Sequence, residues 1–242
     1  MMNSKGFQSV ASATKPRISA IIPVYNEAGK VCLVLETLRQ VDRISEIIVV
    51  DDGSTDSSAE EIKLAAQSDP RIQLVANPVN QGKGQAIFLG WQATESRCLL
   101  LLDGDLFGLN PQHIQDLINP VLDSHADMAI GQFRKGKWTS DIPHWFTPWL
   151  SGQRSLRADL LKQVSPKAAA GYGFETALTV AAKQNEWRCA RVILSGVWHL
   201  PGEARRGLWK GFKNRARMYR QISSAWYTAG GFHRVGFRPR VR

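Results

Sequence analysis

The sequence has few cysteines and no long hydrophobic stretch. Its 242 residues include three cysteines, Cys32, Cys98 and Cys189, an odd number with wide spacing. This argues against a disulfide framework and against a zinc cluster, so we expect reduced, buried thiols. The longest apolar runs are far shorter than the roughly 18 residues that span a bilayer, and the first residues lack an apolar core of signal-peptide length. We therefore expect a soluble, cytoplasmic protein.

Internal repeats and low-complexity linkers are also absent from the sequence, which indicates one compact domain. Residues 1–16 are polar and irregular, and we expect them to be a disordered tail. The domain is predicted over 17–202, with a first half at 17–132 and a second at 133–202. A basic C-terminal helix and tail follow at 203–242.

Acidic residues are nearly missing from this tail. Residues 1–202 hold 20 Lys and Arg against 20 Asp and Glu, whereas 203–242 hold 11 against one, so the whole net charge of +10 lies in the tail. Apolar residues recur in it at helical spacing: Leu208, Phe212, Ala216, Tyr219, Ile222 and Trp226. Such a helix suits docking on the domain first, peripheral contact with an anionic membrane at the inner face second, and nucleic acid least.

Short apolar runs alternate with helical patterns along the first half. Strands are predicted at 17–25, 46–52, 71–77, 98–105, 126–132 and 190–199, and helices at 29–41, 57–67, 82–94, 111–122, 155–164 and 173–185. Strands that are apolar on both faces are typical of a parallel sheet covered by helices on both sides. The expected fold class is α/β with a mostly parallel sheet.

Two aspartates directly follow the apolar run LLLL at 99–102. If the strand continues through them, Asp103 and Asp105 project from the same face. Ligands of such sheets bind at the carboxyl ends of the strands, where two carboxylates can hold magnesium or manganese. Gly104 would leave room for a diphosphate to approach the backbone. The alternative is a solvated acidic turn.

Two further strands are predicted to deliver polar groups to the same edge. In IIVVDDGSTD, Asp51 and Asp52 end a strand and Gly53 makes the turn, so a carboxylate could accept a base N–H or a ribose hydroxyl. Ordinary turn and cap chemistry is the alternative there. In IIPVYNEAGK the first strand ends at Pro23 and becomes a polar turn.

Four segments carry a family resemblance. PVYNE at 23–27, VVDDGSTD at 49–56, NQGKGQA at 80–86 and LLDGDL at 101–106 resemble, in order and spacing, the nucleotide-sugar-binding half of family 2 glycosyltransferases with the GT-A fold. The resemblance covers about residues 17–132. It implies a nucleoside diphosphate sugar, either UDP- or GDP-linked, as donor and a divalent cation, Mg²⁺ or Mn²⁺.

The resemblance also implies roles for individual residues. Pro23, Tyr25, Glu27 and Asp52 would surround the nucleoside. Lys83 would lie near the diphosphate or the base. Asp103 and Asp105 would handle ribose, metal and diphosphate. Of the two, we assign the ion to Asp105 and the ribose or a bridging contact to Asp103, with Gly104 providing clearance.

Two segments in residues 133–202 narrow the resemblance to particular groups of glycosyltransferases. LSGQRSLRADLL at 150–161 and GYGFETALT at 171–179, followed by a strand ending in WH, look like two groups: the dolichyl-phosphate or polyprenyl-phosphate hexose synthases and the glucosyl-3-phosphoglycerate synthases. In both groups the acceptor bears a phosphate. The second group implies that His199 joins the metal. Glu175 would contact acceptor or sugar, or act as base; an acid that favours the helix dipole is the alternative.

Cations and aromatic residues frame the expected acceptor side. Arg154 is predicted to position the acceptor phosphate, together with Arg157, Arg134 and Lys135, although solvated surface charges are the alternative. The loop 133–150 carries Trp138, Trp145, Phe146 and Trp149. These rings would close over the sugar or touch lipid, unless they pack on the core, which we favour for Trp149.

The sequence therefore predicts a metal-dependent enzyme that moves glucose or mannose from a nucleoside diphosphate sugar to a phosphate-bearing acceptor, either a polyprenyl phosphate or a small molecule. A nucleotidyltransferase and a non-catalytic binder of anionic surfaces are the alternatives from other classes. The donor base, the sugar, the acceptor and the stereochemical course stay open.

Overall fold

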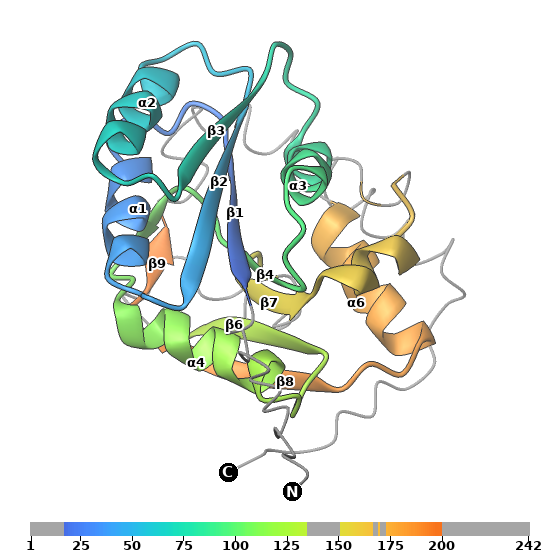
Figure 1. Cartoon of the computed structure of the whole chain (residues 1–242). Coiled ribbons are helices and arrows are strands. Elements are labelled where there is room, and N and C mark those ends of the chain that lie inside the picture. The colour runs from blue at the N-terminus through green and yellow to red at the C-terminus, as the bar shows by residue number, and fades with distance from the viewer. Residues whose placement is uncertain (1–16, 135–150, 167–168, 170–172, 200–242) are drawn as a thin grey trace, which may run out of the picture.

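A computed structural model describes residues 17–134, 151–166, 169 and 173–199, which form one central sheet with helices on both faces (Figure 1). Its elements, in chain order, are β1 (Ile18–Val24), α1 (Val31–Arg39), β2 (Ile44–Asp52), α2 (Ser58–Ser68), β3 (Ile72–Asn77), α3 (Lys83–Gln92), β4 (Cys98–Leu101), β5 (Leu106–Phe107), α4 (Pro111–Leu122), β6 (Met128–Arg134), β7 (Arg154–Arg157), the 3₁₀ helix η2 (Ala158–Gln163), α6 (Phe174–Gln184), β8 (Cys189–Ser195) and β9 (Trp198–His199).

The main sheet has seven strands in the order β3-β2-β1-β4-β7-β6-β8. β7 pairs antiparallel with both of its neighbours, and the other pairings are parallel. A separate antiparallel pair joins β5 to β9. The predicted α/β class with a mostly parallel sheet is confirmed.

Both faces of the sheet are buried, which explains why the strands read as continuous apolar runs. Side chains alternate between two core clusters: Ile47 and Val49 of β2 join the cluster under α1, α2 and α4, whereas Ile48 and Val50 join the cluster under α3, η2 and α6. In Figure 1, α1 and α2 lie on one side of the sheet and α3 and α6 on the other. Each face of the sheet is thus covered by its own packed core.

Three predicted elements differ from the structure. The predicted helix at 155–164 is wrong, because Arg154–Arg157 forms β7 between β4 and β6 and only a 3₁₀ helix follows. The predicted strand at 190–199 is broken by Gly196, whose φ of 76° turns the chain so that β9 pairs with β5 instead of the main sheet. β4 ends at Leu101, two residues before Asp103. Sheet pairing overrode local helical preference in the first case.

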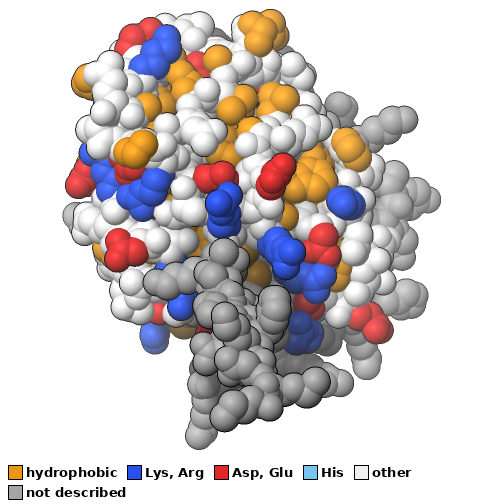
Figure 2. All heavy atoms as spheres, in the orientation of Figure 1, with side chains coloured by type: hydrophobic (Ala, Val, Ile, Leu, Met, Phe, Trp, Pro, Cys, Tyr) orange, Lys and Arg blue, Asp and Glu red, His pale blue; other side chains and the backbone are white. Residues whose placement is uncertain are grey.

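Charges of both signs are mixed over the surface that Figure 2 shows, in agreement with the even balance of residues 1–202. In the described ranges, no helix combines the length and the apolarity needed to cross a membrane. The predicted tails at 1–16 and 203–242 lie outside the described residues, and the domain boundaries stay predictions.

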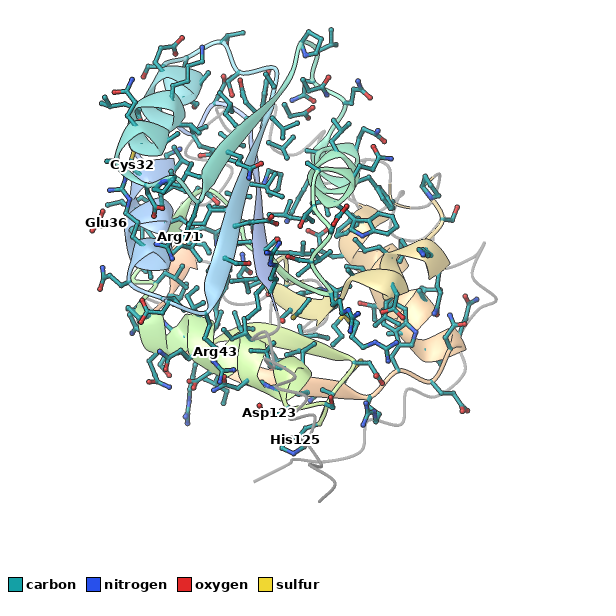
Figure 3. The ribbon with its side chains drawn as sticks, in the orientation of Figure 1. Cys32, Glu36, Arg43, Arg71, Asp123 and His125 are labelled. Atoms are coloured by element: carbon teal, nitrogen blue, oxygen red, sulfur yellow. The ribbon has the colours of Figure 1, made fainter. Side chains whose placement is uncertain are left out.

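Arg71, labelled in Figure 3, connects the start of β2 to the neighbouring loops on the α1 side of the sheet. Arg71 donates to the carbonyl oxygens of Arg39, Val41 and Ile44 at 2.9–3.3 Å. It also forms a two-pronged pair with the Asp69 carboxylate, at 2.8 and 3.1 Å. The hydrogen bond from Arg71 is the main reason that the pKa of Asp69 lies below its ordinary value of 3.8.

Helix α3 approaches the sheet closely at Gly90. A Cβ atom there would lie 2.6 Å from Cγ2 of Ile21 and 3.1 Å from Cγ2 of Val50. Both partners belong to central strands, so neither can move without disturbing the core.

Gly90→Ala tests this packing, because two effects of opposite sign compete. Alanine should stabilise a helix by about 0.5–1 kcal/mol relative to glycine, whereas overpacking a core costs about 1–3 kcal/mol. We expect net destabilisation of about 1–2 kcal/mol in urea unfolding. Gln92→Ala, on the exposed end of the same helix, is the control. A Gly90→Ala protein as stable as the wild type would contradict the close approach.

Asp69→Asn tests the Arg71 pair through pH. Because the pKa of Asp69 is lower in the folded state, its contribution to stability is present above the unfolded pKa and is lost as pH falls through the folded pKa. We expect the variant to lose about 2 kcal/mol of unfolding free energy at pH 7, and the gap to the wild type to close below pH 4. Urea unfolding between pH 7 and pH 2.5 measures it.

The control is Asp123→Asn, an exposed aspartate at the end of α4 (Figure 3). This variant should follow the wild-type pH curve throughout. A constant gap between Asp69→Asn and wild type down to the lowest pH would refute the electrostatic origin of the effect.

Candidate active site

Three parallel strands deliver their carboxyl ends to one edge of the sheet. Val24 of β1 pairs with Asp51 of β2, and Ile21 of β1 pairs with Leu101 of β4. The turns that follow β1, β2 and β4 therefore start side by side. This confirms the expectation that the polar segments after these strands meet at one edge.

The turns after β1 and β2 hold each other in place. The backbone N–H of Asn26 donates to Ser54 Oγ at 3.0 Å, and that of Thr55 donates back to Asn26 Oδ1 at 2.8 Å. The N–H of Glu27 donates to Ser58 Oγ at 2.9 Å. Asn26 has a φ of 56°, a backbone state that asparagine tolerates better than most residues. The polar residues of GSTDSS thus shape the first turn.

Asp52 fixes the loop that leads into α3. Its carboxylate accepts hydrogen bonds from Asn77 Nδ2 at 2.7 Å and from the N–H groups of Gln81 and Gly82 at 3.0 and 2.7 Å. The residue is only 3% exposed. Because α3 begins at Lys83, these bonds set where that lysine enters the site. The predicted nucleoside contact of Asp52 stays a prediction.

The other predicted nucleoside residues lie around the end of β1. Pro23 belongs to the strand, and Tyr25 follows it with 38% of its surface exposed. Glu27 is 8% exposed and accepts a hydrogen bond from Lys30 Nζ at 2.9 Å. Among these three, Tyr25 offers the accessible ring.

Lys83 joins three separate segments of the chain. Its Nζ lies 2.5 Å from Asp103 Oδ1 and 2.5 Å from Glu175 Oε1. Asp103 stands in the turn after β4, and Glu175 in the first turn of α6. Burial alone would lower the pKa of Lys83, but the two carboxylates outweigh it and raise the pKa above its ordinary value of 10.5. The ammonium therefore stays charged.

Asp103 is held on its other oxygen by Gln153. The Gln153 Nε2 donates to Asp103 Oδ2 at 2.8 Å, and Gln153 Oε1 accepts from Ser151 Oγ at 2.9 Å. Burial would raise the pKa of Asp103, but Lys83 first, then Gln153 and the nearby His199, lower it overall. The carboxylate is therefore ionised and fixed in direction.

Sequence reasoning did not single out Gln153 or its neighbour Gly152. Gln153 is 1% exposed, and a Cβ atom on Gly152 would lie 2.5 Å from Lys83 Nζ and 2.8 Å from Asp103 Oδ2. A side chain at this position would displace Lys83 or Asp103, so glycine lets the chain pass the ion pair as it stands. Both residues lie in the quoted LSGQR segment, but their partners are set by the pairing of β7, which the sequence pattern did not indicate.

His199 reaches the Asp103–Asp105 turn through the β5–β9 pair. His199 pairs with Leu106, the residue after Asp105, and its ring centroid lies 5.6 Å from that of Phe133. Asp105 is 7% exposed. Within the described residues, no group of three or more His, Cys, Asp or Glu side chains is arranged to hold a metal. The metal roles of Asp105 and His199 stay predictions.

Gly104 has a packing role in this turn. A Cβ atom there would lie 3.2 Å from Cγ2 of Val24, so the absence of a side chain lets the turn lie against the end of β1. Because β4 ends at Leu101, the alternation argument that placed Asp103 and Asp105 on one face does not apply.

Arg154 is held by protein groups at the start of α6. Its side chain is fully buried and donates to the carbonyl oxygens of Ser151 at 2.9 Å and Glu175 at 3.2 Å, and to Thr179 Oγ1 at 3.1 Å. Burial lowers its pKa to about 10, against the opposing effect of Glu175. These bonds hold the start of α6, and the predicted contact of Arg154 with the acceptor phosphate stays a prediction.

The other cations that were predicted beside the acceptor lie in different places. Arg157 pairs with Cys98 at the start of β4, so it lies at the opposite edge of the sheet, where it forms ion pairs with Asp127 and Asp159. Its predicted place beside the site is wrong. Arg134 is exposed at the end of β6. Lys135, Trp138, Trp145, Phe146 and Trp149 lie outside the described residues.

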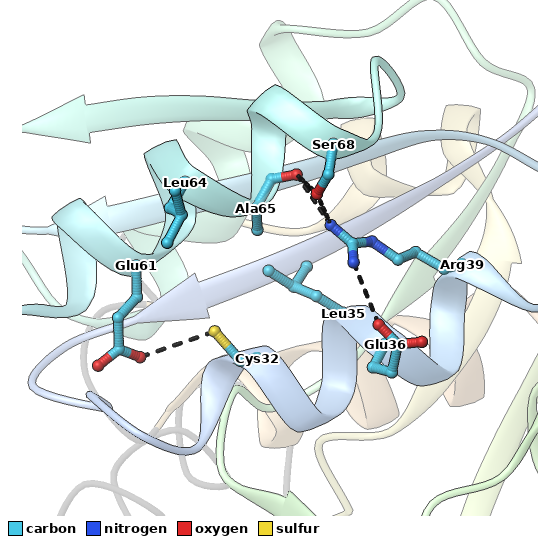
Figure 4. Close-up of a pocket in the computed structure, with 8 residues that line it drawn as sticks. All are labelled: Cys32, Leu35, Glu36, Arg39, Glu61, Leu64, Ala65 and Ser68. Carbon is cyan, nitrogen blue, oxygen red and sulfur yellow. Dashed lines mark hydrogen bonds and ion pairs between the residues drawn. The ribbon is translucent and has the colours of Figure 1, made fainter.

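Two hollows on the described surface do not include Lys83, Asp103 or Glu175. One, of about 270 Å³, lies between α1 and α2 and is lined by Cys32, Leu35, Glu36, Arg39, Glu61, Leu64, Ala65 and Ser68 (Figure 4). The other, of about 480 Å³, borders the starts of β4 and η2. Neither contains the charged groups that meet at Lys83, so chemistry rather than hollow size identifies the site.

Asp52→Asn tests the anchoring of the loop before Lys83. The amide keeps one oxygen and replaces the other with a donor, so one of the Gln81 and Gly82 N–H groups loses its acceptor. We expect faster hydrogen exchange in this pair and a loss of about 2 kcal/mol in unfolding free energy. NMR-detected exchange measures the first and urea unfolding the second. The control is Asp51→Asn, whose Oδ1 accepts from the Ser54 N–H and should affect that amide instead. Unchanged exchange at Gln81 and Gly82 would contradict the anchoring.

Comparison with known proteins identifies relatives of this chain. The chain is 35% identical over 119 residues to an uncharacterized glycosyltransferase of Haemophilus influenzae, covering 49% of this chain and 47% of the relative. It is 28% identical over 213 residues to the undecaprenyl-phosphate mannosyltransferase of Micrococcus luteus, covering 78% and 87%. It is 41% identical over 95 residues to the undecaprenyl-phosphate 4-deoxy-4-formamido-L-arabinose transferase of Pectobacterium carotovorum, covering 37% and 29%. The chain thus spans about half or less of two of these relatives.

Solved structures agree on the fold. Glucosyl-3-phosphoglycerate synthase from Mycobacterium tuberculosis, in complex with phosphoglyceric acid, superposes with a TM-score of 0.71 at 23% identity, covering 88% of this chain and 80% of that one. This likeness confirms a GT-A-like fold. Residues 19–176, more than half of the chain, match the family model for glycosyl transferase family 2. The chain therefore belongs to glycosyl transferase family 2.

Proposed function

We propose that the protein is a metal-dependent glycosyltransferase that moves a hexose, glucose or mannose, from a nucleoside diphosphate sugar to a phosphate-bearing acceptor. The observation that carries the proposal is the meeting of Lys83, Asp103 and Glu175 at the carboxyl edge of the sheet. Membership in the family supports a sugar-transfer activity. The GT-A-like fold supports a donor site at this edge.

The donor would lie across the ends of β1, β2 and β4. Tyr25 is exposed there and would cover the nucleoside, with Pro23 and Glu27 beside it. Lys83 is the cation that would contact the diphosphate, and Asp103 would contact ribose. Asp52 would act on the donor mainly through the loop that it holds before Lys83.

A divalent cation fits the residues that the β5–β9 pair brings to the turn. Asp105 offers a carboxylate and His199 an imidazole, a set that suits manganese and, with substrate oxygens completing the shell, magnesium. When bound, the ion would neutralise the diphosphate leaving group. Related structures support this ligand class, since glucosyl-3-phosphoglycerate synthase was solved with Mn²⁺ and UDP-glucose and with Mg²⁺ and UDP.

The acceptor side is formed by the start of α6. A phosphate acceptor is ionised at neutral pH, so it requires less from a general base than a sugar hydroxyl. Glu175 would orient the acceptor or the sugar, and Arg154 would hold Glu175 through the α6 backbone. The names of the relatives support two acceptor types: an undecaprenyl phosphate for the Micrococcus luteus protein and phosphoglyceric acid for the mycobacterial synthase.

The basic tail at 203–242 would supply any contact with an anionic membrane. Its charge and its apolar stripe suit the surface of a bilayer that carries a polyprenyl phosphate. Docking of the same stripe on the domain is the other arrangement, and we propose no nucleic-acid partner. A cytoplasmic location is consistent with either.

Asp105→Ala tests the donor and metal site. UDP-glucose, UDP-mannose, GDP-glucose and GDP-mannose are each added with and without manganese, and thermal unfolding is recorded. A ligand at 100 times its Kd stabilises by about 2.7 kcal/mol, so the matching donor should raise the Tm of the wild type when manganese is present. The variant should lose the manganese-dependent part of this shift while keeping its ligand-free Tm within a few degrees.

Asp123→Ala, which removes an exposed carboxylate from α4, is the matched control and should respond like the wild type. The proposal fails if no donor shifts the wild type, or if the manganese-dependent shift persists in Asp105→Ala.

A further inference from the structure

Lys83 is already paired with two carboxylates. Its ammonium lies 2.5 Å from Asp103 and 2.5 Å from Glu175, and the charge of Glu175 also interacts with the buried Arg154 guanidinium. Lys83 is the cation proposed to receive the donor diphosphate. A diphosphate that approaches it must therefore compete with an anion already in place.

We infer that Glu175 is an internal competitor of the donor: its carboxylate occupies the place at Lys83 that a phosphate group of a nucleoside diphosphate takes, and donor binding releases Glu175. This inference rests on the proposed function. The side chain of Lys83 is 29% exposed, which leaves it accessible to a phosphate, whereas the side chain of Glu175 is 12% exposed.

Glu175, rather than Asp103, is the partner that leaves. Asp103 is also held by Gln153 Nε2 at 2.8 Å and lies against Gly152, so it keeps a partner when Lys83 turns away. In the part of the chain that the structure describes, Lys83 is the only hydrogen-bond donor to the Glu175 carboxylate. A phosphate can replace that single contact.

The backbone around Glu175 is anchored independently of its side chain. Its carbonyl oxygen accepts hydrogen bonds from Arg154 and, at 2.8 Å, from Thr179 Oγ1. The Glu175 side chain can therefore change partners while α6 stays in place. Donor binding would then free a carboxylate at the start of α6, on the proposed acceptor side.

The experiment measures the affinity of nucleoside diphosphates for the full chain. Kd values for UDP and GDP with manganese are determined by calorimetry for wild type and Glu175→Gln, an isosteric change that removes the competing charge. We expect the variant to bind the preferred diphosphate about fivefold more tightly or better. The free nucleosides, uridine and guanosine, should bind both proteins equally. A gain in affinity cannot come from misfolding.

Glu186→Gln is the matched control, because it removes one negative charge from the residue just beyond α6, where the side chain is exposed. It should bind UDP and GDP like the wild type. If Glu175→Gln binds the diphosphate with unchanged or weaker affinity, the inference is wrong. If its gain is matched by Glu186→Gln, the effect is general charge repulsion and the inference is equally wrong.

A second pair of variants tests whether the competition runs through Lys83. Lys83→Met should weaken diphosphate binding, and adding Glu175→Gln to it should give no further gain. A full gain in the Lys83→Met background would overturn the inference. Failure of the proposed function has a different result: the wild type would bind neither UDP nor GDP under any condition. A wild type that binds while Glu175→Gln shows no gain sinks the inference alone.

Discussion

The ammonium group of Lys83 is the point on which the site depends. It is reached from three directions: α3 carries it, the turn after β4 presents Asp103, and α6 presents Glu175. Hydrogen bonds from other residues hold each of these segments. Asp52 anchors the loop before α3, Gln153 fixes Asp103, and Arg154 holds the start of α6. A single charge thus organises residues from both halves of the chain.

Polar residues that stand in similar sequence contexts have different roles in this site, since some support the backbone and others form the charged cluster. Asp52 and Asp103 both follow apolar strands, yet Asp52 is 3% exposed and satisfies backbone N–H groups, whereas Asp103 faces an ion pair beside exposed surface. Arg154 and Lys83 are both cations near Glu175, but Arg154 binds its carbonyl oxygen and Lys83 its carboxylate. Sequence position alone does not separate these duties, because burial and partner identity arise from the fold.

Much of the fold and part of the site could be predicted from the sequence. The alternation of apolar runs and helical patterns identified the doubly covered sheet, and the strand ends indicated where polar groups collect. Gly152, Gln153 and the buried state of Arg154 were beyond that reasoning. Their places depend on the insertion of β7 between β4 and β6, a long-range pairing that leaves no periodic signal in four residues. The break at Gly196, which brings His199 to β5, also depends on a long-range pairing, so the sequence pattern did not predict it.

The antiparallel direction of β7 has a consequence for how the site can be assembled. A parallel strand would bring its last residues to the site edge, but β7 enters there, so its first residue and the two before it reach Lys83, Asp103 and Glu175 while Arg157 lies at the far edge. Slippage of this strand by one residue would turn Arg154 to the opposite face of the sheet and withdraw Gln153 from Asp103. The alignment of one short strand therefore decides whether Gln153 reaches Asp103 and whether Arg154 reaches the backbone of Glu175.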